Sequence, residues 1–269
     1  MSGFSAEWLA LRESYDLRAR NPIVFEAVAV AFKSLDALSV VDLACGAGST
    51  VRAIGPHLPA RQRWDLVDND PGLLTVACSG QFSDAVKLKA VPLDLSSNFA
   101  VALDGTKDLI TISALLDLVS EDWLDRFTRH IAARALRVYA ALTYDGRIDL
   151  SPADPLDAAI TSALNAHQRT DKGFGPALGP SAAAVAISKF KALGYAIMQG
   201  NSDWVIGTAD QEIQNELLAG WAGAASEVKT LPRPDIDNWL ARRRIAVRER
   251  VSKMRVGHVD FFATPSVTR

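Results

Sequence analysis

The chain has 269 residues, which suits one decorated α/β domain as well as two smaller domains. Hydrophobic residues make up 49% of the sequence and charged residues 22%, a balance that supports a sizeable core and excludes a disordered chain. The 29 basic and 31 acidic residues leave a net charge of −2. A general electrostatic hold on nucleic acid or on an anionic membrane is therefore not expected.

The composition also bears on cross-links and location. Cys45 and Cys78 are the two cysteines, and neither belongs to a CxxC pair or to a cysteine and histidine cluster. This argues against a disulfide framework and a structural zinc, and it suits a reducing compartment. No run of about 18 apolar residues occurs, and the first residues lack a basic region followed by an apolar one. We expect a cytoplasmic protein that does not span a membrane and holds no metal.

The first half of the chain predicts helices and then an α/β alternation. Two helical segments come first, at 6–20 and 25–33. From Ser39 onward, β-rich runs alternate with helical stretches, which is typical of a parallel sheet with helices on both faces. The five predicted strands are SVVDLA, WDLVD, KLKAV, DLITI and LRVYAAL.

The second half is less regular. Residues 144–180 read as a loop rich in proline and glycine, and a loop of this length in a compact domain is usually functional. A helix over 181–194 and the strand YAIMQ follow, then helical segments at 208–225 and 234–254 and a final strand VDFFATP. In the last helix an apolar stripe predicts that five arginines form its solvated face. They are Arg242, Arg243, Arg244, Arg248 and Arg250.

The most informative stretch is VVDLACGAGST at 40–50, where an apolar strand turns through Gly46 and Gly48 into a helix. Glycines allow a ligand to approach the backbone closely, and the helix start offers N–H groups to an anionic group. Twenty residues after Gly48, the next strand ends at Asp68, where a carboxylate can accept hydrogen bonds from ribose hydroxyls. Together these features predict an adenosine-containing cofactor.

Two residues bear on which cofactor this is. A dinucleotide fingerprint requires a third glycine, and Val51 stands at that position. Asp42 before the glycines suits a ligand with an ammonium group better than a pyrophosphate.

These segments resemble the class I S-adenosylmethionine-dependent methyltransferases, a family with a doubly wound seven-stranded sheet of Rossmann-like type. The resemblance extends motif by motif from Val40 to about Thr143, and more loosely over YAIMQ and VDFFATP. DLACGAGS resembles the first motif, usually D-x-G-x-G-x-G, with Ala44 in place of the first glycine. LVDNDPGLL, VPLDLSS and DLITISALLDLV resemble the second, third and fourth motifs. Each match alone is weak, whereas four in order at the family's spacing are specific.

The resemblance implies S-adenosylmethionine as cofactor and S-adenosylhomocysteine as product. It assigns Asp68 to the ribose hydroxyls, Asn69 to the adenine edge and Asp94 to the adenine amino group; a helix-capping turn is the other interpretation of Asp94. N-terminal helices cover the cofactor in similar enzymes, so Arg20 is a candidate for its carboxylate. The cofactor-binding residues so implied are Asp42, Ala44, Cys45, Gly46, Gly48, Asp68, Asn69, Asp94, Leu95, Ser113 and Arg20.

Residues for acceptor chemistry are sought at the ends of the fourth and fifth strands and in the loop that follows. His167 is the first candidate for a general base because imidazole titrates near neutral pH. Asp117 and Tyr144 are the alternatives, since they lie just past strands four and five. The same loop carries Lys172 and Phe174, and its polar residues favour an acceptor with hydroxyl or amino groups.

The sequence as a whole predicts a single methyltransferase domain. We expect a helical lid at 1–38, a cofactor-binding core at 39–143, and acceptor-side additions at 144–180 and 208–254. The predicted activity is methyl transfer to a small molecule, at oxygen or else at nitrogen, with no nucleic acid or membrane partner. A nicotinamide-dependent oxidoreductase and a non-catalytic cofactor-binding module remain as alternatives. The helical addition between the last two strands could instead make a homodimer contact.

Overall fold

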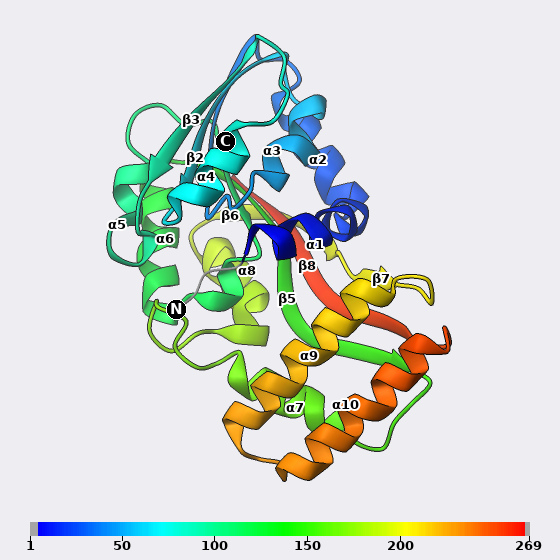
Figure 1. The fold of residues 1–269 in the computed structure, drawn as a ribbon. Helices are drawn as coiled ribbons and strands as arrows, with labels where there is room; N and C mark the ends of the chain where they lie inside the picture. The colour runs from blue at the N-terminus through cyan, green and yellow to red at the C-terminus, as the bar shows by residue number, and fades with distance from the viewer. Residues whose placement is uncertain (1–4, 267–269) are drawn as a thin grey trace.

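A twisted, mostly parallel sheet is the centre of the computed structural model, which describes residues 5–266 (Figure 1). Within that range it has eight strands in the order β3-β2-β1-β4-β5-β8-β6, and β7 pairs with β8 beside this path. The strands are β1 Ala37–Leu43, β2 Arg61–Asp68, β3 Val86–Pro92, β4 Leu109–Ser113, β5 Arg137–Ser151, β6 Tyr195–Asn201, β7 Trp204–Ile206 and β8 Lys253–Pro265.

Strands β1 to β5 run parallel, and β8 is antiparallel to its neighbours β5, β6 and β7. Because parallel strands end at a common edge, the loops after β1, β2, β3 and β4 meet there, which is where ligands bind in open α/β sheets.

The helices are α1 Ala6–Ala19, α2 Pro22–Phe32, α3 Ser49–Ile54, α4 Pro71–Cys78, α5 Leu95–Ala102, α6 Glu121–Ala133, α7 Asp157–His167, α8 Ala182–Ala192, α9 Gln211–Val228 and α10 Arg233–Arg248. Short 3-10 turns are η1 Gly55–His57, η2 Leu116–Leu118 and η3 Gly179–Ser181. Several helices begin at the predicted caps: Asp70 accepts hydrogen bonds from the Gly72 and Leu73 amides, and Ser120 accepts one from Trp123. None of these helices, within residues 5–266, is long and apolar enough to cross a membrane.

Three apolar clusters hold the molecule together. One joins α5, α6 and α8 to one face of the sheet, and a second joins α2, α3 and α4 to the other face. The third is formed by α7, α9 and α10 around the outer ends of β5 and β8, and it also includes side chains of α1. Figure 1 shows this helical group beside the ends of the two long strands. The doubly wound architecture predicted from the sequence is confirmed.

Three sequence predictions are corrected by the structure. The sheet has eight strands and not seven, because the short β7 adds to β8. The predicted loop at 144–180 contains the outer half of β5 and all of α7, since β8 supplies a distant pairing partner for residues 143–151. The last helix ends at Arg248 and not at Met254, because Lys253 and the residues after it pair with β5 and β7.

Arg243 departs from the predicted solvated face of α10. Its side chain is 2% exposed and forms an ion pair with Asp157 at the start of α7. Arg242 beside it pairs with Asp154. These two arginines therefore attach α10 to the first residue of α7 and to the segment just before it.

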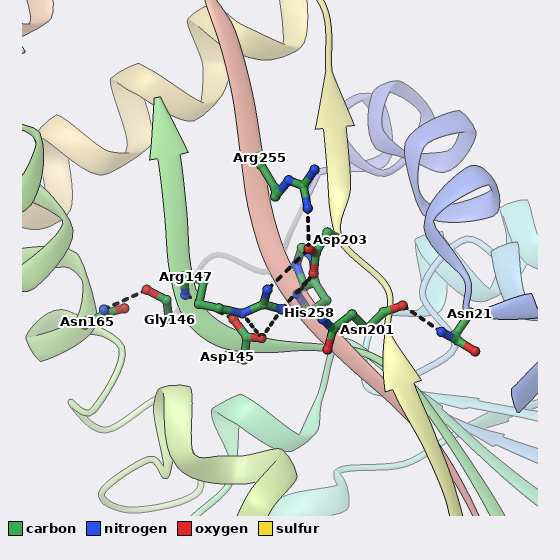
Figure 2. Close-up of polar contacts among 9 residues, drawn as sticks. All are labelled: Asn21, Asp145, Gly146, Arg147, Asn165, Asn201, Asp203, Arg255 and His258. Carbon is green, nitrogen blue, oxygen red and sulfur yellow. Dashed lines mark hydrogen bonds and ion pairs between the residues drawn. The ribbon is translucent and has the colours of Figure 1, made fainter. Parts of the chain in front are cut away.

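Asp203, between β6 and β7, holds the β5 and β8 strands together at their bend (Figure 2). Its carboxylate, 9% exposed, accepts hydrogen bonds from Arg147 at 2.8 Å, from Arg255 at 3.4 Å and from the His258 amide at 3.3 Å. Arg147 also pairs with Asp145 across the irregular part of β5.

Replacing Asp203 with alanine should lower the free energy of unfolding by roughly 1 to 2 kcal/mol, the range for hydrogen bonds to a charged group at a partly solvated site. Urea denaturation would measure the loss. Asp237→Ala is the matched control, since Asp237 forms an ion pair with Arg233 in which both side chains are more than half exposed. Equal losses in the two variants would contradict the role given to Asp203.

Candidate functional site

A cavity of about 840 Å³ opens at the carboxyl edge of the parallel strands. Its size lies within the range of small-molecule and cofactor sites. Loops after β1, β2, β3 and β4 form its floor, and α1 and residues 172–174 complete its walls. The polar or charged residues that line it are Arg12, Glu13, Asp16, Ser49, Thr50, Asp68, Asn69, Asp70, Asp94, Ser96, Ser113 and Lys172.

The turn between β1 and α3 supplies the glycine-rich part of the wall. Gly46 has φ +53°, and its amide donates a hydrogen bond of 2.9 Å to Asp68 Oδ2. A Cβ added to Gly46 would lie 3.1 Å from Leu9 of α1. Gly48 has φ +82° and does not line the cavity; an added Cβ there would lie 3.0 Å from the Ala77 Cβ in α4. One glycine therefore shapes the cavity, and the other permits close packing of α3 on α4.

Ala44 occupies the position at which the resembling family usually has a glycine. Its φ of +54° lies in the left-handed region, which costs an L-residue about 1 to 2 kcal/mol. Alanine in place of the motif's glycine therefore adds backbone strain as well as a methyl group. Ala44, Cys45 and Gly46 all line the cavity, and burial raises the pKa of the Cys45 thiol.

The predicted ribose and adenine residues line the same cavity. Asp68 ends β2, is 9% exposed, and also accepts a hydrogen bond from the Asp70 amide at 3.0 Å. Asn69 follows it on the wall. Asp94 lines the cavity, and it caps α5 by accepting a hydrogen bond of 2.8 Å from the Ser96 amide, as the capping interpretation predicts. Leu95 lies beside it.

A buried polar cluster lies beneath this floor. Asp42 is fully buried; Thr111 donates to its Oδ1 at 2.7 Å, and its Oδ2 has no hydrogen-bond partner among the described residues. Arg20 donates to Tyr139 Oη at 3.3 Å and to Ser113 Oγ at 3.3 Å. Ser113 lines the large cavity, but Asp42 and Arg20 do not. Arg20 lines a separate small cavity between α1 and α3.

Burial raises the pKa of Asp42 from its ordinary value of 3.8 to about 7. The folded state therefore holds a proton that the unfolded chain releases at lower pH, and the stabilisation from this group is lost as pH rises from about 4 to 7. Asp42→Asn removes the titration. Its stability relative to wild type should rise across that pH range, as measured by urea unfolding at a series of pH values. Asp237→Asn on exposed α10 is the control, and a pH-independent difference for Asp42→Asn would contradict the assignment.

The three candidates for acceptor chemistry lie in different environments. Asp117, in η2, is 6% exposed, and its Oδ1 has no hydrogen-bond partner among residues 5–266. Burial raises the pKa of Asp117 to about 6. It does not itself line the cavity, although Leu115 and Leu118 on either side of it do.

Tyr144 and His167 are also absent from the cavity wall. Tyr144 lies in β5 and donates a hydrogen bond of 2.7 Å to Asn165 of α7, and burial raises its pKa above the usual range. His167 ends α7, where Nε2 lies 2.9 Å from Glu227 of α9 and Nδ1 lies 3.2 Å from Lys172 Nζ. The structure thus brings a neighbour of His167, and not His167 itself, to the cavity.

The sequence analysis predicted an N-terminal helical lid but did not identify the α1 residues that line the cavity. Leu9, Arg12, Glu13 and Asp16 line the cavity, and Arg12 forms an ion pair with Asp16 at 2.9 Å. Their spacing of three and four residues places them on one helix face. That periodicity alone could not identify them, because a charged face directed at a ligand has the same spacing as a solvated one.

Comparisons with known proteins agree with this architecture. No protein-family model matches the sequence, and no curated protein matches it. A cyclopropane-fatty-acyl-phospholipid synthase-like protein from Lactobacillus casei superposes with a TM-score of 0.50 at 13% identity, over 97% of this chain and 94% of its own. A cyclopropane synthase from Mycobacterium tuberculosis has a TM-score of 0.49 at 8% identity, covering 89% and 82%. A methyltransferase from Thiobacillus denitrificans, crystallised with S-adenosyl-L-homocysteine, has a TM-score of 0.45 at 12% identity, covering 97% and 99%.

The strand order and the likeness to the Lactobacillus casei protein show that this chain has a Rossmann-like α/β fold, as the sequence predicts. The antiparallel β8 between β5 and β6 takes the place of the seventh strand expected from the sequence resemblance.

Proposed function

We propose that the protein is an enzyme that transfers a methyl group from S-adenosylmethionine to a small-molecule acceptor. The observation that carries the proposal is that residues from all four resembling motifs line one cavity of cofactor size. Gly46, Asp68 and Asp94 lie at the carboxyl ends of three different strands, and the strand order brings them together. The bound cofactor would supply a methyl group that its sulfonium already activates.

The residues present fit this cofactor. Asp68 retains acceptor capacity for ribose hydroxyls beyond its two backbone hydrogen bonds, because a carboxylate has about four acceptor sites. Asn69 and Asp94 offer polar groups for the adenine, and Leu95 offers an apolar surface. Asp42 and Arg20 lie behind the wall and would act on the cofactor through Ser113 and Thr50 or through their charge.

The remaining work of such an enzyme is to position the acceptor and exclude water. We assign the lid to α1, whose residues 9–16 lie on the wall, and the core to 39–143 within a single domain. The addition at 144–180 is assigned to acceptor binding because residues 172–174 reach the cavity, and the addition at 208–254 because its Glu227 contacts His167 beside Lys172. A small acceptor in a cytoplasmic setting is favoured over nucleic acid by the net charge of −2.

Cofactor binding is the first test. S-adenosylhomocysteine should raise the melting temperature and NAD should not, because a ligand that binds only the folded state stabilises it. Asp68→Ala should weaken S-adenosylhomocysteine binding by roughly 1.5 to 3 kcal/mol in calorimetry, the range for hydrogen bonds to a charged group.

Asp70→Ser is the matched control for that variant. Asp70 lies on the same turn and lines the cavity, and serine preserves the cap of α4. Stabilisation by NAD alone would favour the oxidoreductase alternative. Binding of S-adenosylhomocysteine without any labelled product, after incubation with isotopically labelled methyl donor and a metabolite extract, would favour the non-catalytic module.

For an acceptor that must lose a proton, we propose Asp117 as the general base, because Leu115 and Leu118 on either side of it line the cavity; Tyr144 and His167 are the other candidates. Its pKa of about 6 is close to the range in which a base works near neutral pH. The rate at saturating cofactor should rise with pH through about 6 and then level off, because the carboxylate form accepts the proton. Asp117→Asn should abolish this limb of the profile and lower the rate by roughly 100-fold or more.

Asp122→Asn, at an exposed position in the first turn of α6, is the control and should keep the wild-type profile. An unchanged pH profile in Asp117→Asn would remove Asp117 as the base. A loss in His167→Ala of more than about threefold, at constant acceptor affinity, would transfer the role to His167.

A further inference from the structure

The cavity wall contains two cationic side chains, Arg12 and Lys172, and their surroundings differ. Arg12 is neutralised by Asp16, with Nε to Oδ2 at 2.9 Å and Nη2 to Oδ1 at 3.3 Å. Within residues 5–266, no carboxylate oxygen lies within ion-pair distance of Lys172 Nζ. Among residues 5–266, Lys172 is therefore a cation at the wall without a direct ion pair, and the Glu227 carboxylate acts on it only from beyond His167.

Two neutral acceptors hold the Lys172 ammonium. Nζ lies 3.0 Å from Thr170 Oγ1 and 3.2 Å from His167 Nδ1. His167 Nε2 lies 2.9 Å from Glu227 Oε2, so the neutral tautomer with hydrogen on Nε2 donates to the carboxylate and leaves Nδ1 as an acceptor. An ammonium has three donors, and one remains for a ligand.

Hydrogen bonds fix the loop that carries Lys172. Asp171 Oδ1 accepts hydrogen bonds from the amides of Gly173 at 2.7 Å and Gly175 at 3.0 Å, and both glycines have positive φ. Farther along, the Leu178 amide donates to Val119 at 2.8 Å, which joins the loop to the segment after β4. A cation that the fold already holds in position loses little conformational entropy when it binds a ligand.

The surroundings of Lys172 are partly apolar. Phe174 lies on the same wall and packs edge-on against Trp123 with ring centroids 5.8 Å apart. Leu115 and Leu118, which follow Ser113 at the end of β4, line the cavity too. Burial lowers the pKa of Lys172. Partial removal of water strengthens the attraction between an ammonium and an anionic oxygen.

We propose that Lys172 determines acceptor specificity, and that the acceptor is a small organic carboxylate whose apolar part lies against Phe174 and Leu118. His167 and Glu227 are then positioning residues, since they act on the acceptor through the Lys172 ammonium. This inference rests on the proposed function and gives its acceptor a chemical class.

The test compares two probes of nearly equal shape, benzoate and benzamide, titrated into protein saturated with S-adenosylhomocysteine and followed by ligand-observed NMR. Benzoate should bind roughly tenfold or more tightly than benzamide, as expected for a hydrogen bond to a charged partner. Lys172→Met should remove this preference and Lys172→Arg should keep most of it. Lys191→Met, at an exposed position in the last turn of α8, is the charge-matched control and should behave as wild type.

The positioning role has its own readout. His167→Ala should reduce the preference for benzoate without changing S-adenosylhomocysteine affinity, because the Lys172 ammonium loses one of its two supports. Glu227→Gln should have a smaller effect in the same direction, since its side chain is 73% exposed.

Each outcome bears on one claim. If S-adenosylhomocysteine does not bind the wild type, the proposed function fails. If it binds but benzoate shows no preference, no binding up to millimolar concentration, or the same preference in Lys172→Met, the inference fails and the proposed function stands. A loss of S-adenosylhomocysteine affinity in Lys172→Met would assign the cation to the cofactor carboxylate and would also overturn the inference.

Discussion

The hydrogen bond from the Gly46 amide to Asp68 is the contact on which the geometry of the site depends. It joins the turn after β1 to the end of β2, and Gly46 has a left-handed backbone in that turn. The same carboxylate accepts the Asp70 amide, so the entry into α4 is positioned from the same point. Two strand ends and two helix starts are thereby held around one side chain, and the cavity opens between them.

The charges around the cavity differ with depth. At the wall, Arg12 and Asp16 neutralise each other, whereas the hydrogen-bond partners of Lys172 among the described residues are Thr170 and His167. Beneath the wall, Asp42 and Arg20 belong to a buried cluster with Thr111, Tyr139 and Ser113. Burial raises the pKa of Asp42 and also of Asp117. Carboxyl groups with raised pKa values beside a cavity are common at functional sites. They also lower the stability of the folded state once the pH exceeds the pKa of the unfolded chain.

The cofactor half of the molecule could be predicted from the sequence because its signals are local. The turn at 44–48, the cap at Asp70 and the strand end at Asp68 depend on residues close together in the chain, and the structure confirms the elements they predict. The outer half of β5 was missed because its partner β8 lies more than a hundred residues away, and the end of α10 was missed because β8 begins soon after it. His167 was sought at the cavity for its chemistry, yet its position follows from α7 and α9 packing, which no local pattern encodes. The buried Arg243 was missed for the same reason, because its partner lies on another helix.

The long β5 and β8 strands have one further consequence. Their inner halves belong to the central sheet, while their outer halves leave it and carry α7, α9 and α10 (Figure 1). The helical unit is thus built on a two-stranded ribbon that extends beyond the central sheet. Because α7, α9 and α10 all follow β5 in the chain, they can differ in length or sequence without altering the register of the first four strands.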